Sequence, residues 1–145
     1  MILQMDWVER RANNEKMFRS QLPIAWEHLC GAMKRAIESY MSLFTETGAD
    51  ADLARRYTNE ATVTLKATDH SAKFCQARIQ LNMKTGELIV EYPRRNAQTD
   101  GQHLTSRFHV NEGVTFYLGE KRLTFDEASE AIIGRVLFPT PDQWV

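Results

Sequence analysis

Between residues 61 and 118, apolar side chains fall on alternate positions in several short runs that are separated by turn residues. Val63 and Leu65 alternate with threonines, and Ile79 and Leu81 alternate with arginine and glutamine. Such alternation is the pattern of a β-strand with one buried face. The pattern therefore predicts an antiparallel sheet with one apolar and one polar face. We expect its five strands, in meander order, at residues 60–68, 73–83, 87–93, 104–110 and 114–119.

The turn residues between these runs suggest how the strands pair. Thr85-Gly86 suits a two-residue hairpin turn, and Asn111-Glu112-Gly113 suits a three-residue loop. The resulting registers pair Val63 with Ile79, Leu81 with Val90, and Phe108 with Phe116. Each register sets apolar residues opposite apolar residues, and a slip of one residue would destroy that match.

Three segments carry helical signals. Residues 6–20 are rich in helix formers and hold ion pairs at i,i+4 spacing, although apolar residues are few. Pro23 lacks the N–H that an interior helical position donates, so we expect a break or a new first turn there. Residues 24–44 carry the strongest stripe of apolar side chains at helical spacing. Residues 124–137 form a third helix that begins with a capping-box sequence.

These patterns together predict an α+β fold with two N-terminal helices, a five-stranded antiparallel meander and a C-terminal helix. The helices are expected to pack on one face of the sheet. With 145 residues, of which 43% are hydrophobic and 26% charged, the chain is expected to form a single domain over residues 1–145. The architecture resembles the helix-on-curved-sheet domains of the cystatin-like and NTF2-like kinds, which include both enzymes and binding proteins. No motif assigns the chain to a particular family.

Charge and hydropathy narrow the classes of partner. The formal net charge of -1 provides no overall field for nucleic acid or an anionic membrane. Basic doublets lie on different predicted elements with acidic residues between them, so we expect no nucleic-acid surface. No run approaches the roughly 18 to 20 apolar residues of a membrane span. Cys30 and Cys75 fall on apolar stripes, as buried free thiols do, and we expect a cytoplasmic location.

Motifs for catalysis and metal binding are absent from the sequence. There is no Walker loop, no G-x-G-x-x-G, no G-x-S-x-G and no C-x-x-C. His28 and Cys30 are two residues apart, which points them about 200° apart on a helix. His103 and His109 share a strand face but lie about 20 Å apart along it. We therefore predict no catalytic residue, no metal site and no cofactor.

One group of chemically capable side chains lies on the polar face of the predicted sheet. The predicted registers bring Arg107, His109 and Tyr117 together, with Glu91 and Arg78 nearby. Arg107 could hold an anion while His109 moves a proton, which would make a small-molecule site or an enzyme. However, polar sheet faces normally meet water, and cross-strand pairs of this kind are ordinary surface partners. We keep this ligand site as the alternative.

Our preferred interpretation is a non-catalytic protein-interaction or adaptor domain, with a homodimer as one option. It rests on apolar residues that have no clear place in the core. Trp7 and Phe18 lie on the sparsely apolar first helix, and Trp144 lies near the end of the chain. Exposed tryptophans on weakly apolar segments suit a protein partner.

Overall fold

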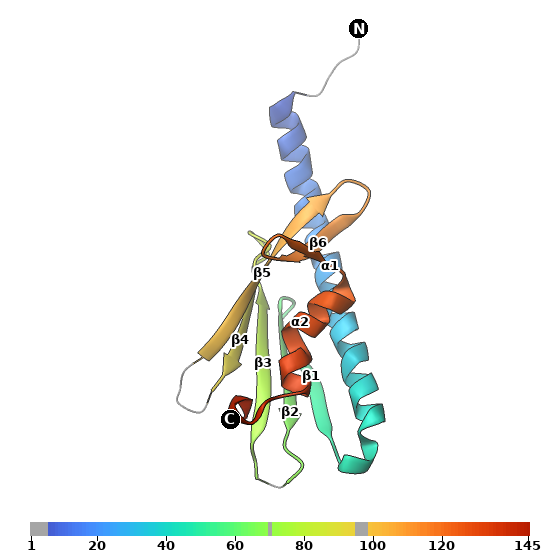
Figure 1. Ribbon diagram of the computed structural model, residues 1–145. Coiled ribbons are helices and arrows are strands. Elements are labelled where there is room, and N and C mark those ends of the chain that lie inside the picture. The colour runs from blue at the N-terminus through green and yellow to red at the C-terminus, as the bar shows by residue number, and fades with distance from the viewer. Residues whose placement is uncertain (1–5, 70, 95–98) are drawn as a thin grey trace.

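The computed structural model describes residues 6–69, 71–94 and 99–145. The fold is α+β, with a long helix α1 (Trp7–Leu43), an antiparallel sheet of seven strands and a second helix α2 (Phe125–Leu137) (Figure 1). The strands are β1 (Asp50–Arg56), β2 (Glu60–Lys66), β3 (Phe74–Leu81), β4 (Leu88–Pro93), β5 (Thr99–His109), β6 (Gly113–Leu118) and β7 (Lys121–Leu123). Two short 3₁₀ helices, η1 (Thr45–Thr47) and η2 (Pro141–Gln143), follow α1 and α2.

The two predicted N-terminal helices are a single helix, so the predicted break at Pro23 is wrong. Asp6 caps the helix and accepts a hydrogen bond of 2.8 Å from the Glu9 amide. Pro23 lies on the exposed side, where water can reach the carbonyl that its missing N–H leaves free. Leu22 before the proline and Trp26 after it are fully buried. Tertiary packing on both sides of the proline therefore keeps the helix continuous.

The sheet contains two strands that the alternation pattern does not predict. The predicted five strands correspond to β2 through β6, whereas β1 and β7 are additional strands at the two edges. Residues 50–56 read Asp-Ala-Asp-Leu-Ala-Arg-Arg, which is too charged to give a clear strand signal, and β7 has only three residues. Both segments become strands because each has a neighbouring strand to pair with, which is a tertiary effect.

All three predicted registers differ from the observed ones by two residues. The observed pairs are Val63 with Ala77, Leu81 with Leu88, and Phe108 with Val114. The β3–β4 loop is longer than predicted: residues 82–87 connect the two strands, and the Gly86 amide donates to the Asn82 carbonyl over 2.7 Å. The β5–β6 loop keeps its predicted three residues but lies one residue earlier in the chain. Because side chains alternate with a period of two, a shift of two residues leaves each side chain on its predicted face.

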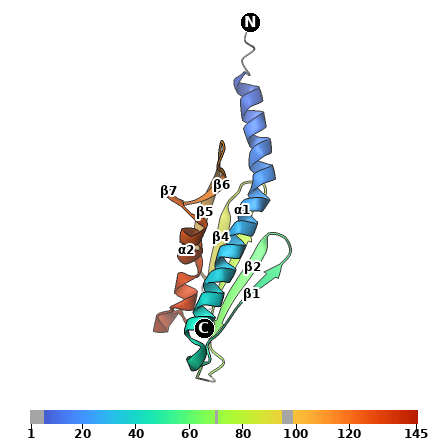
Figure 2. The same cartoon turned by 90° about the vertical axis from the view of Figure 1, so that its right-hand side faces the viewer.

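The core lies between the sheet and the two helices, which run side by side over one face of the sheet (Figure 2). The predicted apolar faces of the central strands are confirmed as buried. Cys30 and Cys75 are free thiols inside this core. The capping box is also confirmed: the Glu127 amide donates to the Thr124 hydroxyl over 3.1 Å, and the Thr124 amide donates to the Glu127 carboxylate over 3.0 Å. None of the helices within the described ranges is long and apolar enough to cross a membrane.

Candidate functional site

The first turns of α1 extend beyond the sheet (Figures 1 and 2). Every residue from 6 to 17 is exposed, whereas one face of the helix is buried from Leu22 onward. We call residues 6–17 the helical extension. Trp7 is 62% exposed and Val8 is 53% exposed, although both are apolar. The extension thus presents large apolar side chains to solvent on a regular helix.

The face of the extension that continues the buried stripe of α1 mixes apolar and charged residues. Val8, Arg11 and Glu15 precede Leu22 at helical spacing and so lie on the same side of the helix. The Arg11 guanidinium lies 5.5 Å from the centroid of the Trp7 ring. This geometry is a cation–π contact, which holds the indole against the helix surface.

The other two predicted interface residues, Phe18 and Trp144, contact the rest of the chain. Phe18 is half-buried at the base of the extension, where its ring packs over Gly86. Trp144 packs against the core, and the next residue, Val145, donates a backbone hydrogen bond of 2.8 Å to the Phe74 carbonyl. Of the three residues, Trp7 is therefore the most exposed.

The five predicted ligand residues lie on the polar face of the sheet but fall into two groups. In the first group, Tyr117 is buried between two neighbours: the Arg107 guanidinium is 4.4 Å from its ring centroid, and His109 Nε2 is 2.5 Å from its hydroxyl. In the second group, Arg78 and Glu91 pair across β3 and β4 and line a hollow of about 420 Å³.

The distance between the two groups follows from the strand registers. Glu91 is opposite Gly101 on β5, and Arg107 lies six residues further along the same strand. At about 3.3 Å per residue, Arg107 therefore lies roughly 20 Å along the sheet from the position of Glu91. The sheet thus does not bring the five side chains into one ligand site.

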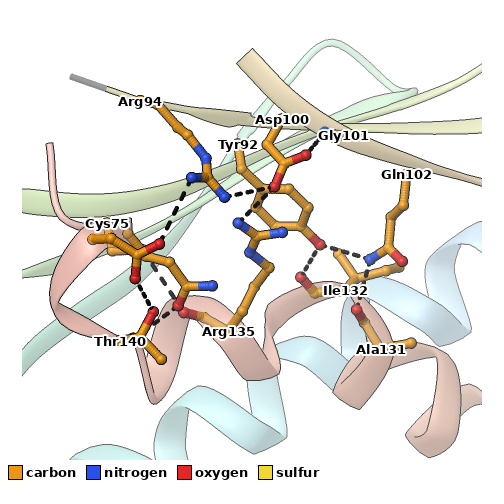
Figure 3. Close-up of polar contacts among 12 residues, drawn as sticks. Cys75, Tyr92, Arg94, Asp100, Gly101, Gln102, Ala131, Ile132, Arg135 and Thr140 are labelled. Atoms are coloured by element: carbon orange, nitrogen blue, oxygen red, sulfur yellow. Dashed lines mark hydrogen bonds and ion pairs between the residues drawn. The ribbon is translucent and has the colours of Figure 1, made fainter. Parts of the chain in front are cut away.

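A polar cluster between α2 and the sheet was not predicted from the sequence (Figure 3). The buried Tyr92 hydroxyl donates to the Ile132 carbonyl over 2.6 Å and accepts from the Gln102 amide over 2.6 Å. The Arg135 guanidinium lies 4.0 Å from the Tyr92 ring centroid and 3.0 Å from an Asp100 carboxylate oxygen. The cluster joins residues of β4, β5 and α2, which only the tertiary structure brings together.

The electrostatics of this cluster indicate a structural role. Burial raises the pKa of Tyr92 to about 12, so its hydroxyl stays protonated at neutral pH. Hydrogen bonds from Arg94 and Arg135 lower the pKa of Asp100, which keeps that carboxyl ionised. The neutral phenol and the paired carboxylate therefore fasten α2 to the sheet.

A groove of about 800 Å³ runs between α1 and α2. Small residues such as Ala36, Ser39 and Gly134 line it, and it ends beside Leu43 and Phe138. Leu43 is 80% exposed and Phe138 is 66% exposed. The groove is a second place where the described chain shows apolar side chains to solvent.

No protein-family model matches this chain, and comparisons with curated proteins and with solved structures also find no match.

Proposed function

We propose that this chain is a non-catalytic protein-interaction domain whose helical extension is the contact surface. The observation that carries the proposal is the exposure of Trp7 on a helix that extends beyond the sheet. Tryptophan is enriched among the residues that dominate protein–protein binding energy. Burying Trp7 and Val8 in a partner would contribute about 1.5 to 3 kcal/mol for each side chain.

The extension is already ordered, which favours binding. The Asp6 cap closes its N-terminus, and an ion pair of 2.7 Å between Glu15 and Arg19 stabilises its last turn. A helix formed in advance loses less conformational entropy when it docks, so more of the contact energy appears as affinity. The matching partner is a protein with an apolar groove that receives one face of a helix.

The charges of the extension define the partner further. Arg11 and Glu15 flank the apolar contact residues, so charges of both signs lie on the same helix face. The partner groove is therefore apolar at its centre and carries both an acidic and a basic group at its rim. These charges set the register and orientation of the helix more than they add affinity.

The test compares the wild-type chain with Trp7→Ala and with Leu43→Ala as the matched control. Both variants remove an exposed apolar side chain from α1, one inside and one outside the extension. Each tagged chain is expressed in the source cells, and quantitative mass spectrometry identifies the proteins that co-purify. We expect Trp7→Ala to lose a protein that the other two chains retain, while its free energy of unfolding changes by less than about 0.5 kcal/mol. Identical sets of proteins from all three chains would contradict the proposal.

The small-molecule alternative has weaker support from the geometry. Its five residues form two groups, and the hollow beside Arg78 and Glu91 is lined mainly by polar atoms. Small-molecule sites are typically concave and mostly apolar, with few polar groups. Binding of a ligand that Arg107→Ala abolishes would favour the alternative.

A further inference from the structure

Strand β1 forms one edge of the sheet and has a neighbouring strand on one side only within the described residues. It is seven residues long, whereas β7 at the opposite edge has three. The outward backbone N–H and C=O groups of such an edge can pair with another strand. Proteins commonly use charged side chains to protect long edge strands from pairing. The charges of β1 therefore determine which strand can pair with it.

The charges of β1 are separated by sign along the strand. Asp50 and Asp52 lie at its start, Arg55 and Arg56 lie at its end, and Leu53 is at the centre. An antiparallel copy of the same strand, centred on Leu53, sets Asp50 opposite Arg56 of the second copy at both ends. A parallel copy in the same register would instead set like charges opposite each other. The strand is therefore complementary to itself in one orientation, as a twofold symmetric interface requires.

The surroundings of Leu53 have the same property. Leu53 is half-buried and lies beside a hollow of about 440 Å³ that is also lined by Lys34, Ile37 and Glu38 of α1. Lys34 and Glu38 are one helical turn apart and opposite in charge. A twofold axis through Leu53 reverses the direction of α1 in the second copy. Lys34 of each copy therefore lies on the same side of the interface as Glu38 of the other copy. Both layers of the edge, strand and helix, are thus compatible with the same axis.

We infer that β1 is a self-association edge at which two copies of this chain pair their β1 strands antiparallel around Leu53. The two sheets join into one continuous sheet, and the helices of both copies cover the same face. This surface is separate from the helical extension, so it adds a second contact to the proposed interaction domain. A homodimer built in this way keeps both extensions free for another protein.

A charge exchange tests the orientation of the pair. Arg56→Asp sets a carboxylate opposite Asp50 of the second copy, and Asp50→Arg sets two guanidinium groups together. We expect each variant alone to dimerise about tenfold more weakly than the wild type in sedimentation equilibrium. An equal mixture of the two variants restores opposite charges at both ends, so it should dimerise like the wild type. The doubly exchanged chain should also recover, which separates lost pairing from lost folding.

A cysteine cross-link tests the register. Residues that face each other in an antiparallel pair have Cα atoms about 4.5 to 5.5 Å apart, within the range of a disulfide. Leu53→Cys should therefore form a covalent dimer under mild oxidation. Ala54→Cys is the matched control, because position 54 lies diagonally from its own copy at about 7 to 8 Å and should cross-link poorly. The native Cys30 and Cys75 are buried, so the wild-type chain serves as the blank.

Three results would overturn the inference. The first is a wild-type chain that stays monomeric at every concentration reached. The second is a dimer that neither charge exchange weakens. The third is a dimer that Trp7→Ala abolishes and Arg56→Asp leaves intact, which would place self-association in the helical extension. In contrast, failure of Trp7→Ala to release another protein would refute the proposed function and leave the β1 pair untouched.

Discussion

Gly86 joins the base of the helical extension to the sheet, and replacing it with alanine tests that junction. The residue is buried, and its φ of 75° lies in the left-handed region. A Cβ atom at this position would overlap Ser106 Oγ and Phe18 Cζ. Ser106 Oγ also donates a hydrogen bond of 2.7 Å to the Gly86 carbonyl, so it has little freedom to move away.

The expected loss of stability has two parts. A left-handed backbone costs a residue with a Cβ about 1 to 2 kcal/mol. Forcing extra volume into a packed site typically costs a further 1 to 3 kcal/mol or so. We therefore expect Gly86→Ala to reduce the free energy of unfolding by about 2 to 5 kcal/mol.

Gly48 provides the matched control because its φ of 70° is nearly the same, while a Cβ there would meet no atom within 4 Å. Gly48→Ala should lose only the backbone part, about 1 to 2 kcal/mol. Urea denaturation followed by circular dichroism measures both variants, with the midpoint and the slope fitted separately. Adding Phe18→Ala to Gly86→Ala should cost less than the sum of the two single losses. Equal losses for the two glycine variants would refute the close packing of Phe18 on Gly86.

Three further expectations concern the helices. Thr124→Ala removes the capping box of α2 and should lower the free energy of unfolding in urea by about 1 kcal/mol. Tyr92→Phe leaves the Ile132 carbonyl without its phenol donor and should cost about 1 to 2 kcal/mol in the same assay; an unchanged free energy of unfolding would contradict a stabilising role for this hydrogen bond. The hydrogen bonds from Arg55 lower the pKa of Glu27, so their contribution is present above pH 4.5 and lost as the pH falls through the lowered pKa. Thermal unfolding between pH 3 and pH 7 or so should therefore show a flatter acid limb for Glu27→Gln than for the wild type.

The buried faces and the start of α2 were predictable because they depend on local patterns. Alternation with a period of two identified β2 through β6, and helical spacing identified the buried stripe of α1. The start of α2 followed from its capping box, whose hydrogen bonds close within one helical turn. These signals need no knowledge of what lies opposite, so one sequence was enough to place them.

The registers required information that the alternation pattern does not contain. A shift of two residues keeps apolar side chains opposite apolar side chains, so several registers satisfy the pattern equally well. The loop between β3 and β4 determines the register of these two strands through its backbone hydrogen bonds and through the close fit of Gly86 against Phe18 and Ser106. That fit depends on a helix more than sixty residues earlier in the chain.

The candidate sites divide in the same way. The sequence by itself determined that Trp7 lies on a helix with few apolar neighbours, because helix propensity and composition are local properties. Only the tertiary structure decided that Trp7 extends beyond the sheet while Trp144 packs on the core, and that Tyr92 meets α2. The edge position of β1 is also tertiary, since a strand with so little alternation forms only where a neighbour satisfies its backbone. Exposure and pairing depend on what the rest of the chain covers, and that is settled only when the sheet and helices pack together.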